Sequence, residues 1–277
     1  MCACFKEEYF AISMEDGDAW AIPIDVYRLI LNLLPKNSII LEFGSGTGTV
    51  KLAKRFKMIS IEHDEKYLHL SKKSTYIHAP IVDYSTNGGY RWYDVEKINN
   101  SLPKKYDLIL IDGPPGSIGR LGAKYHLDML DLKKPILVDD VNRDEERKLA
   151  LEIAKKIGTI PIIFGSGRRK CAIILNYKEL NRIPEKLRDK LEKVKNRLRI
   201  RSFTKINDAK KVSSQLKKEL NWTNYTWEYM EDDKPAYEIQ TGLFTSLYHT
   251  FVQLEKIAEY GEFEIEILSN LEFQDET

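Results

Sequence analysis

The stretch SIILEFGSGTG, residues 38–48, decides the fold of this chain. Its first six residues are mostly apolar, as in a strand that is buried on both faces. Gly44, Gly46 and Gly48 follow, and a backbone without Cβ atoms can turn sharply and approach a ligand closely. The run Thr49 to Phe56 then predicts a helix, whose first N–H groups are free to bind that ligand. A strand, a glycine turn and a helix in this order predict a nucleotide-binding unit.

The spacing of these glycines separates two kinds of nucleotide-binding loop. The dinucleotide fingerprint is G-x-G-x-x-G, and here Thr49 stands where its last glycine would be. The spacing therefore disfavours a nicotinamide-dependent dehydrogenase. An ordinary β-to-α turn is the other alternative, but three glycines at alternate positions are more than such a turn requires.

Working outward from the loop, short apolar runs alternate with amphipathic stretches. Further strands are predicted at residues 58–62, 75–78, 107–112 and 135–139. Helices are predicted at residues 23–34 and 144–157, the second with acids in its first turn and lysines in its last. Residues 161–164 and 171–175 flank a Gly-Ser-Gly turn and predict an antiparallel hairpin. We therefore expect an α/β fold with a Rossmann-like, doubly wound, mostly parallel sheet that ends in this closing hairpin.

Charge divides the chain near residue 178. Residues 178–218 carry 15 Lys/Arg and 5 Asp/Glu, whereas residues 219–277 carry 2 Lys/Arg and 14 Asp/Glu. We therefore expect one domain over residues 1–177 and a smaller α+β domain over residues 178–277. The elements predicted in the second domain are helix 178–198, strand 200–205, helix 208–220, strands 225–230 and 236–241, helix 243–260 and strand 262–268. After the first helix, this is the β-α-β-β-α-β order of a ferredoxin-like domain.

Composition excludes several classes of protein. The chain has 277 residues, of which 43% are hydrophobic and 31% charged, so it can bury a core and is not globally disordered. Its net charge of +1 gives no whole-chain attraction to nucleic acid or to anionic lipid. No apolar run approaches the roughly 20 residues that span a bilayer, and residues 1–10 lack a secretory signal pattern. With three cysteines and no disulfide framework, we expect a cytoplasmic protein without a membrane partner.

The second predicted strand ends in Glu62, which is followed by His63 and Asp64. Glu62 lies about 20 residues after the first glycine of the loop, where an acid can accept two hydrogen bonds from the diol of a ribose. A solvated acid at a strand end is the alternative, and the nearby glycine loop favours ribose binding.

A cluster of acids is predicted at the same edge of the sheet. Asp112 ends one strand, and Asp139 and Asp140 end the next. Carboxylates that converge in this way repel one another unless a cation, a proton or basic neighbours balance them. Oxygen ligands suit Mg²⁺. Arginines such as Arg120 and Arg143 are the alternative source of positive charge.

The glycine loop and the acidic strand end resemble those of the class I S-adenosylmethionine-dependent methyltransferases, over roughly residues 15–177. The runs ILEFGSGTGT and ISIEHDEKY are similar to small methyltransferases with the patterns E-x-G-S-G-x-x-T and E-H-D. The resemblance implies S-adenosylmethionine as the cofactor, with the loop around its amino-acid end, Glu62 on its ribose and Asp83 near its adenine. The cofactor-binding residues that it implies are Glu42, Gly44, Ser45, Gly46, Thr47, Gly48, Glu62, His63, Asp83 and Asp112.

The acid cluster is similar to that of the divalent-metal-dependent O-methyltransferases of the catechol, caffeoyl-CoA and macrolide-sugar types. The resemblance implies Asp112, Asp139 and Asp140 as ligands of Mg²⁺, with Asn142 as a possible fourth. The run Gly113–Gly116 departs from the more polar residues common in the catechol type. The runs DGPPG and DDVNR are closest to sugar-directed relatives such as the glucuronoxylan methyltransferase type.

These resemblances imply transfer of a methyl group to a hydroxyl oxygen of a small molecule or a sugar. The protein would mainly align the two reactants, and a metal would lower the pKa of a chelated hydroxyl. Asp112, Lys124 or His126 would take the proton as the catalytic group. The loop 117–124, which is basic and contains two glycines, would act as a lid over the substrate.

Two further hypotheses come from the second domain. Its basic stretch, residues 186–201, could grip RNA, which would make the chain an RNA methyltransferase. Alternatively, the acidic half neutralises this stretch within the fold or across a homodimer. A non-catalytic cofactor-binding or assembly protein is the remaining alternative, because so strong a separation of charge could serve to meet a partner.

Overall fold

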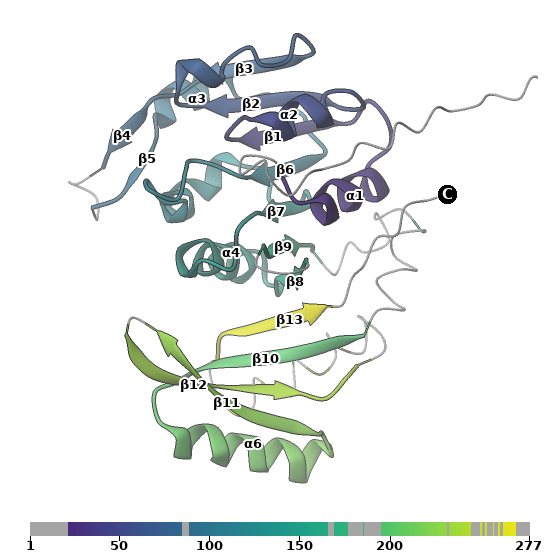
Figure 1. The fold of residues 1–277 in the computed structure, drawn as a ribbon, viewed down its shortest axis with the longest axis vertical. Coiled ribbons are helices and arrows are strands. Elements are labelled where there is room, and N and C mark those ends of the chain that lie inside the picture. Colours follow the sequence, from purple (N-terminus) through teal and green to yellow (C-terminus); the bar gives the residue numbers. More distant parts are fainter. Residues whose placement is uncertain are drawn as a thin grey trace, which may run out of the picture.

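The computed structural model describes residues 22–84, 89–165, 169–176, 185, 195–231, 233–244, 250, 253, 257, 260 and 263–269. Strands from both parts of the chain form one long sheet, and helices pack on its two faces (Figure 1). Within these residues, no helix combines the length and the apolar character that crossing a bilayer requires.

The first part of the chain contains nine strands among its described residues. They are β1 (Ile39–Phe43), β2 (Lys57–Glu62), β3 (Ser74–His78), β4 (Ile81–Asp83), β5 (Arg91–Tyr93), β6 (Leu108–Ile111), β7 (Ile136–Val138), β8 (Ile162–Phe164) and β9 (Cys171–Ile174). The helices are α1 (Ile24–Leu33), α2 (Thr47–Leu52), α3 (Val95–Ser101), α4 (Asp144–Ile157) and the 3₁₀ segments η1 (Glu65–Tyr67) and η3 (Leu121–Met129).

The strand order confirms the predicted fold class. Seven strands lie in the order β3-β2-β1-β6-β7-β9-β8, and β1 pairs in parallel with both β2 and β6. Strand β9 runs antiparallel to both β7 and β8, so the predicted closing hairpin is present. The sheet is therefore Rossmann-like, mostly parallel and doubly wound. Its winding reverses between β1 and β6, which is the point where such sheets bind ligands.

Alternate residues of the central strands pack against opposite layers of helices. In β1, Ile40 belongs to a core that includes α1 and α2, whereas Leu41 and Phe43 belong to a core that includes α4 and η3. Burial on both faces explains why these strands are continuous apolar runs in the sequence. Polar side chains are thereby displaced to the strand ends, where the site lies.

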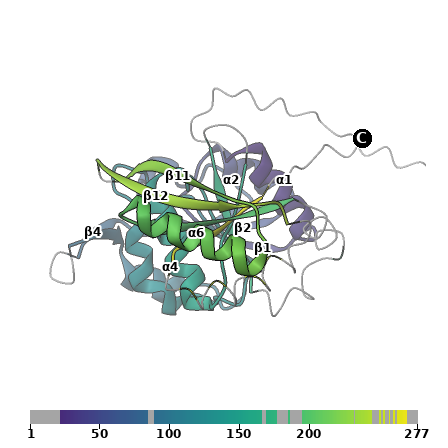
Figure 2. The same cartoon turned by 90° about the horizontal axis from the view of Figure 1, so that it is seen from below.

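The second part of the chain extends the same sheet. Its elements are β10 (Asn196–Phe203), α6 (Ile206–Leu220), β11 (Asn224–Glu231), β12 (Lys234–Thr241) and β13 (Ile265–Ser269). Strand β13 pairs in parallel with β8, and β10, β12 and β11 follow in that order to the edge. Helix α6 lies across β11 and β12 (Figure 2). Leu198 and Leu216 join the core that begins at α1.

The described residues of both parts thus share one sheet, and the hydrophobic core that includes α1 continues from the first part into the second. The division into two domains at residue 178 stays a prediction, as does the ferredoxin-like assignment, because most of the predicted helix 243–260 lies outside the described residues. The predicted helix 178–198 is wrong in its last residues, since β10 begins at Asn196. The hairpin of β4 and β5 was not predicted.

Candidate functional site

A cavity of about 720 Å³ lies at the carboxyl ends of the central strands. Its walls come from the segments that follow β1, β2, β6 and β7, so it occupies the switch point between β1 and β6. Its volume is within the range of about 300–1,000 Å³ that is typical of small-molecule sites. It is therefore the candidate ligand site of the chain.

Most of the residues predicted to bind the cofactor line this cavity. They are Glu42, Gly44, Ser45, Gly46, Gly48, Glu62, His63 and Asp112. Thr47 is exposed at the start of α2 and is not part of the lining. Asp83 is exposed on β4, opposite Arg91 of β5, and the structure does not bring it to the cavity. The hairpin of β4 and β5 accounts for its position.

The glycine loop is built for close approach of backbone segments. Gly44 has φ +90°, which favours glycine, and a Cβ there would lie 3.0 Å from the Cα of Gly113. Gly46 has an extended backbone and precedes α2, where its N–H donates to the hydroxyl of Thr49. The loop therefore passes directly beside the segment that follows β6, and both segments line the cavity.

The carboxylate of Glu62 holds the loop in place. One oxygen accepts hydrogen bonds from the backbone N–H and the hydroxyl of Ser45, at 2.8 and 3.1 Å. The other accepts from the N–H groups of His63 and Asp64, at 2.7 and 2.8 Å. Glu62 is almost fully buried and still borders the cavity. Glu62, the acid predicted to bind the ribose, thus connects the end of β2 to the glycine loop.

Glu42 is a second buried acid of the cavity wall. It accepts hydrogen bonds from the hydroxyls of Thr49 and Ser60, at 2.8 and 2.6 Å. Burial raises the pKa of Glu42 to about 7, although both hydroxyls oppose the shift. Its protonation state therefore changes near neutral pH.

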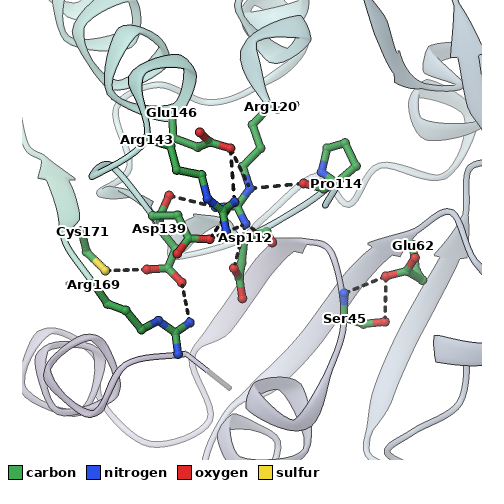
Figure 3. Close-up of polar contacts among 11 residues, drawn as sticks. Ser45, Glu62, Asp112, Pro114, Arg120, Asp139, Arg143, Glu146, Arg169 and Cys171 are labelled. Carbon is green, nitrogen blue, oxygen red and sulfur yellow. Dashed lines mark hydrogen bonds and ion pairs between the residues drawn. The ribbon is translucent and has the colours of Figure 1, made fainter. Parts of the chain in front are cut away.

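Arg120 lies inside the predicted acid cluster (Figure 3). Its side chain is 4% exposed and one nitrogen contacts carboxylate oxygens of Asp112 at 3.2 Å and Asp140 at 3.1 Å. The guanidinium also donates to the backbone carbonyls of Pro114, Asp112 and Asp139. Arg143 adds a second contact to Asp140, at 3.2 Å. The arginine alternative for balancing these acids is therefore present.

The carboxylate of Asp139 points away from Arg120, toward Cys171 and Arg169. One of its oxygens accepts a hydrogen bond from the thiol of Cys171 at 2.6 Å, and the other lies 3.6 Å from Arg169. Burial, and secondarily the neighbouring carboxylate of Asp140, raise the pKa of Asp139. Burial and Asp139 likewise raise the pKa of Asp112 well above its ordinary value, against the opposing effect of Arg120.

The three acids do lie together, as the magnesium hypothesis requires. One ligand atom from each of Asp112, Asp139 and Asp140 lies within 4.8 Å of the others. However, a buried guanidinium already occupies the space beside two of them, and a divalent cation there would meet its positive charge at close range. The donor set therefore does not fit Mg²⁺ while Arg120 keeps this position. Asn142 accepts from the N–H of Lys170 at 3.4 Å and is outside the cavity lining.

The other two predicted catalytic residues lie away from the cavity. His126 shares a hydrogen bond of 2.9 Å with the hydroxyl of Tyr90, and burial lowers its pKa. Lys124 lies over the ring of Tyr125 at 4.8 Å. Neither is part of the cavity lining. The loop 117–124, which was predicted to act as a lid, is held at its centre. There, Arg120 donates hydrogen bonds to the backbone carbonyls of Asp139 and Asp112.

The basic stretch predicted to grip RNA is described only at residues 195–201. There, Arg199 contacts the buried Glu266, and Arg201 contacts Glu238 at 2.9 Å. Arg147 of α4 contacts Glu231 and Glu266, at 3.3 Å each, and joins the two parts of the chain. Part of the charge asymmetry is therefore neutralised within the fold.

Several residues of the cavity wall were not among the predicted cofactor-binding, catalytic or metal-binding residues. They include Thr49, Tyr67, Tyr93 and Arg169. Tyr93 had one signal, since it belongs to the aromatic run Trp92-Tyr93 before a helix, and such a run more often serves packing. Thr49 also had a signal, since it is the threonine that ends the pattern E-x-G-S-G-x-x-T. Tyr67 and Arg169 had no signal that sets them apart from ordinary loop residues.

Comparison with known proteins adds two solved structures. No protein-family model matches the chain, and no curated protein matches it. The fold is similar to that of a candidate O-methyltransferase from Klebsiella pneumoniae, with 16% identity and a TM-score of 0.35 over 55% of this chain and 76% of the other. It is also similar to the O-methyltransferase from Bacillus cereus in complex with SAH, with 12% identity and a TM-score of 0.33 over 82% and 84%. Because both TM-scores are below 0.5, the function proposed below rests on the residues of the site.

Proposed function

We propose that this chain is an S-adenosylmethionine-dependent methyltransferase that acts on a hydroxyl oxygen of a small molecule or a sugar. The observation that carries the proposal is the convergence of the Gly44–Gly48 loop, Glu62 and Asp112 on one cavity at the switch point of the sheet. The glycine loop and Glu62 suit an adenosyl and amino-acid ligand. Asp112 suits removal of the proton from the acceptor hydroxyl.

When bound, S-adenosylmethionine would supply an electrophilic methyl group to the acceptor oxygen, and the electron pair of its S–CH₃ bond would remain on sulfur. Asp112 accepts the proton that the acceptor hydroxyl loses. Its raised pKa favours proton uptake, and 24% of its side chain is exposed. Arg120 holds Asp112 in position through its carboxylate and its backbone carbonyl.

The walls beside the acid cluster suggest the class of acceptor. Arg143 and Arg169 line the cavity with side chains that are 45% and 39% exposed, and Ser117 lies in the same wall. Guanidinium and hydroxyl donors recognise hydroxyl and acidic oxygen atoms. An acceptor that carries several hydroxyls, or a hydroxyl and an acidic group, matches this wall.

Titration with S-adenosylhomocysteine tests the proposal most directly. We expect the purified protein to bind it, as measured by calorimetry, and Gly46→Arg to abolish measurable binding because its side chain would fill the cavity. The extended backbone at Gly46 accepts any residue, so the variant should fold. Thr47→Arg is the matched control, since Thr47 is exposed and outside the lining, and its affinity should equal that of the wild type. Absence of binding to the wild type would refute the proposal.

We further propose that transfer proceeds without a divalent cation, because Arg120 supplies the positive charge beside Asp112 and Asp140. Affinity for S-adenosylhomocysteine and the methylation rate of a responsive acceptor should be the same in Mg²⁺ and in chelator. The midpoint of thermal unfolding of the ligand-free protein should also be unchanged by Mg²⁺. A rate that collapses in chelator and returns with Mg²⁺ would show that the acids hold a metal after all.

A further inference from the structure

One polar group in the wall of the cavity has no role so far. The hydroxyl of Tyr93 is fully buried and has no hydrogen-bond partner among the described residues. The ring of Tyr93 is fixed by contacts with Phe43, His63 and Trp92. Buried hydroxyls are nearly always paired, so an orphaned one in the wall of a cavity indicates a missing partner.

The position of this hydroxyl is set by the two segments that cross at the switch point. A Cβ placed on Gly113 would lie 2.5 Å from the hydroxyl of Tyr93 and 2.7 Å from the Cα of Gly44. Any other residue at position 113 would therefore clash with the hydroxyl and with the backbone of Gly44. Glycine at this position lets the loop after β1, the segment after β6 and the hydroxyl of Tyr93 lie close together in the cavity wall.

The charges around Tyr93 keep its hydroxyl protonated. Burial, and then the carboxylates of Glu62 and Asp112, raise the pKa of Tyr93 well above its ordinary value, whereas Arg120 opposes the shift. A neutral phenol in this setting can donate one hydrogen bond and accept another. Neither Glu62 nor Asp112 accepts a hydrogen bond from this hydroxyl.

We propose that the hydroxyl of Tyr93 donates a hydrogen bond to the bound S-adenosyl ligand, and that Tyr93 is a positioning residue for that ligand at the switch point. This inference rests on the proposed function, since it names a further residue of the same site. It accounts for two features together: the orphaned hydroxyl in the cavity wall, and the glycine at position 113, where a Cβ would clash with that hydroxyl.

Tyr93→Phe removes only the hydroxyl and is the direct test. S-adenosylhomocysteine should bind the variant about tenfold more weakly, as expected for one buried hydrogen bond. Without ligand, the midpoint of thermal unfolding should equal or exceed that of the wild type, because a buried unpaired hydroxyl is removed. Weaker binding with undiminished stability is a combination that a purely structural tyrosine does not produce.

Tyr106→Phe is the matched control. Tyr106 is also buried, but its hydroxyl accepts a hydrogen bond from the backbone N–H of Asp131 at 2.6 Å and lies outside the cavity lining. This variant should lose about 2–4 °C in its unfolding midpoint and keep the affinity of the wild type. If the wild type binds S-adenosylhomocysteine and Tyr93→Phe binds it equally well, the inference about Tyr93 is overturned and the proposed function stands. If the wild type does not bind it, both are overturned.

Discussion

Arg120→Met is expected to lower the free energy of unfolding by about 3–5 kcal/mol at pH 8, as is typical when one partner of a buried ion pair is removed. Methionine keeps most of the aliphatic volume of the side chain and removes its charge. Asp112 and Asp140 would then face each other without the guanidinium that lies 3.2 and 3.1 Å from them. Chemical denaturation at several pH values measures the effect.

The loss should depend on pH in a definite direction. Without Arg120, the pKa of the cluster rises further, so the folded variant takes up protons that the unfolded chain releases. A group whose folded pKa is raised loses its stabilising contribution as pH increases through that pKa. The difference between wild type and variant should therefore be largest at alkaline pH and should shrink as the acids become protonated. A difference that is constant across pH would mean that Arg120 acts by packing alone.

The effect of Mg²⁺ on the stability of Arg120→Met is a second test of the role of Arg120. With the guanidinium of Arg120 removed, Asp112, Asp139 and Asp140 keep only the partly exposed Arg143 and Arg169 as cationic neighbours. Their ligand atoms lie within 4.8 Å of one another. Mg²⁺ should then raise the unfolding midpoint of Arg120→Met while leaving that of the wild type unchanged. Arg143→Met is the control, since this side chain is 45% exposed and its loss should cost less than about 1 kcal/mol. Stabilisation of the wild type by Mg²⁺ would contradict the assignment of Arg120 as the resident cation.

Much of the first part of the fold could be predicted because its strands are buried on both faces. Such strands are continuous apolar runs, and β1, β6 and β7 stand out in the sequence for that reason. Helix α4 was predicted at its observed bounds because acids and lysines mark its two ends. The polar residues that follow these strands then meet at one edge, which is why the cavity could be anticipated.

Other features depend on tertiary contacts that the sequence does not display. Strands β4 and β5 each include an exposed charged residue, Asp83 or Arg91, so neither is a continuous apolar run. Strand β5 contacts η3, where a Cβ on Gly122 would lie 2.8 Å from the carbonyl of Arg91. The sequence also left open whether a metal or arginines balance the acids. Arg120 reaches the acids because the chain turns at Gly119, which has φ +85°. No sequence pattern predicts this turn.

The start of β10 is a different case, because its signal was present. Arg197, Arg199 and Arg201 alternate with Leu198 and Ile200, which is the period of a strand with one buried face. The high charge of residues 178–218 favoured extension of the preceding helix into this region instead. In the structure, Leu198 and Ile200 are buried, while Arg199 and Arg201 contact acids of the neighbouring strands. Alternation was the better guide than composition.

Glu42→Gln is expected to change how stability depends on pH. The pKa of Glu42 rises from 4.5 to about 7 on folding, chiefly through burial. Between these two values the folded protein binds a proton that the unfolded chain has released, so the free energy of unfolding falls as pH rises. The loss is absent below pH 4.5, complete above pH 7, and about 3 kcal/mol in size for a shift of this magnitude.

Glutamine cannot ionise, so the variant should escape this loss. Its carbonyl oxygen can still accept the hydrogen bonds from Thr49 and Ser60 that Glu42 accepts. Wild type and variant should therefore have similar stability near pH 5, and the variant should be more stable by up to about 3 kcal/mol at pH 8. Asp83→Asn, at the exposed end of β4, is the control and should have the same stability as the wild type at both pH values. If Glu42→Gln is instead destabilised at pH 8, the ionised carboxylate of Glu42 stabilises the free protein, and the cavity wall carries a permanent negative charge rather than one that is lost near neutral pH.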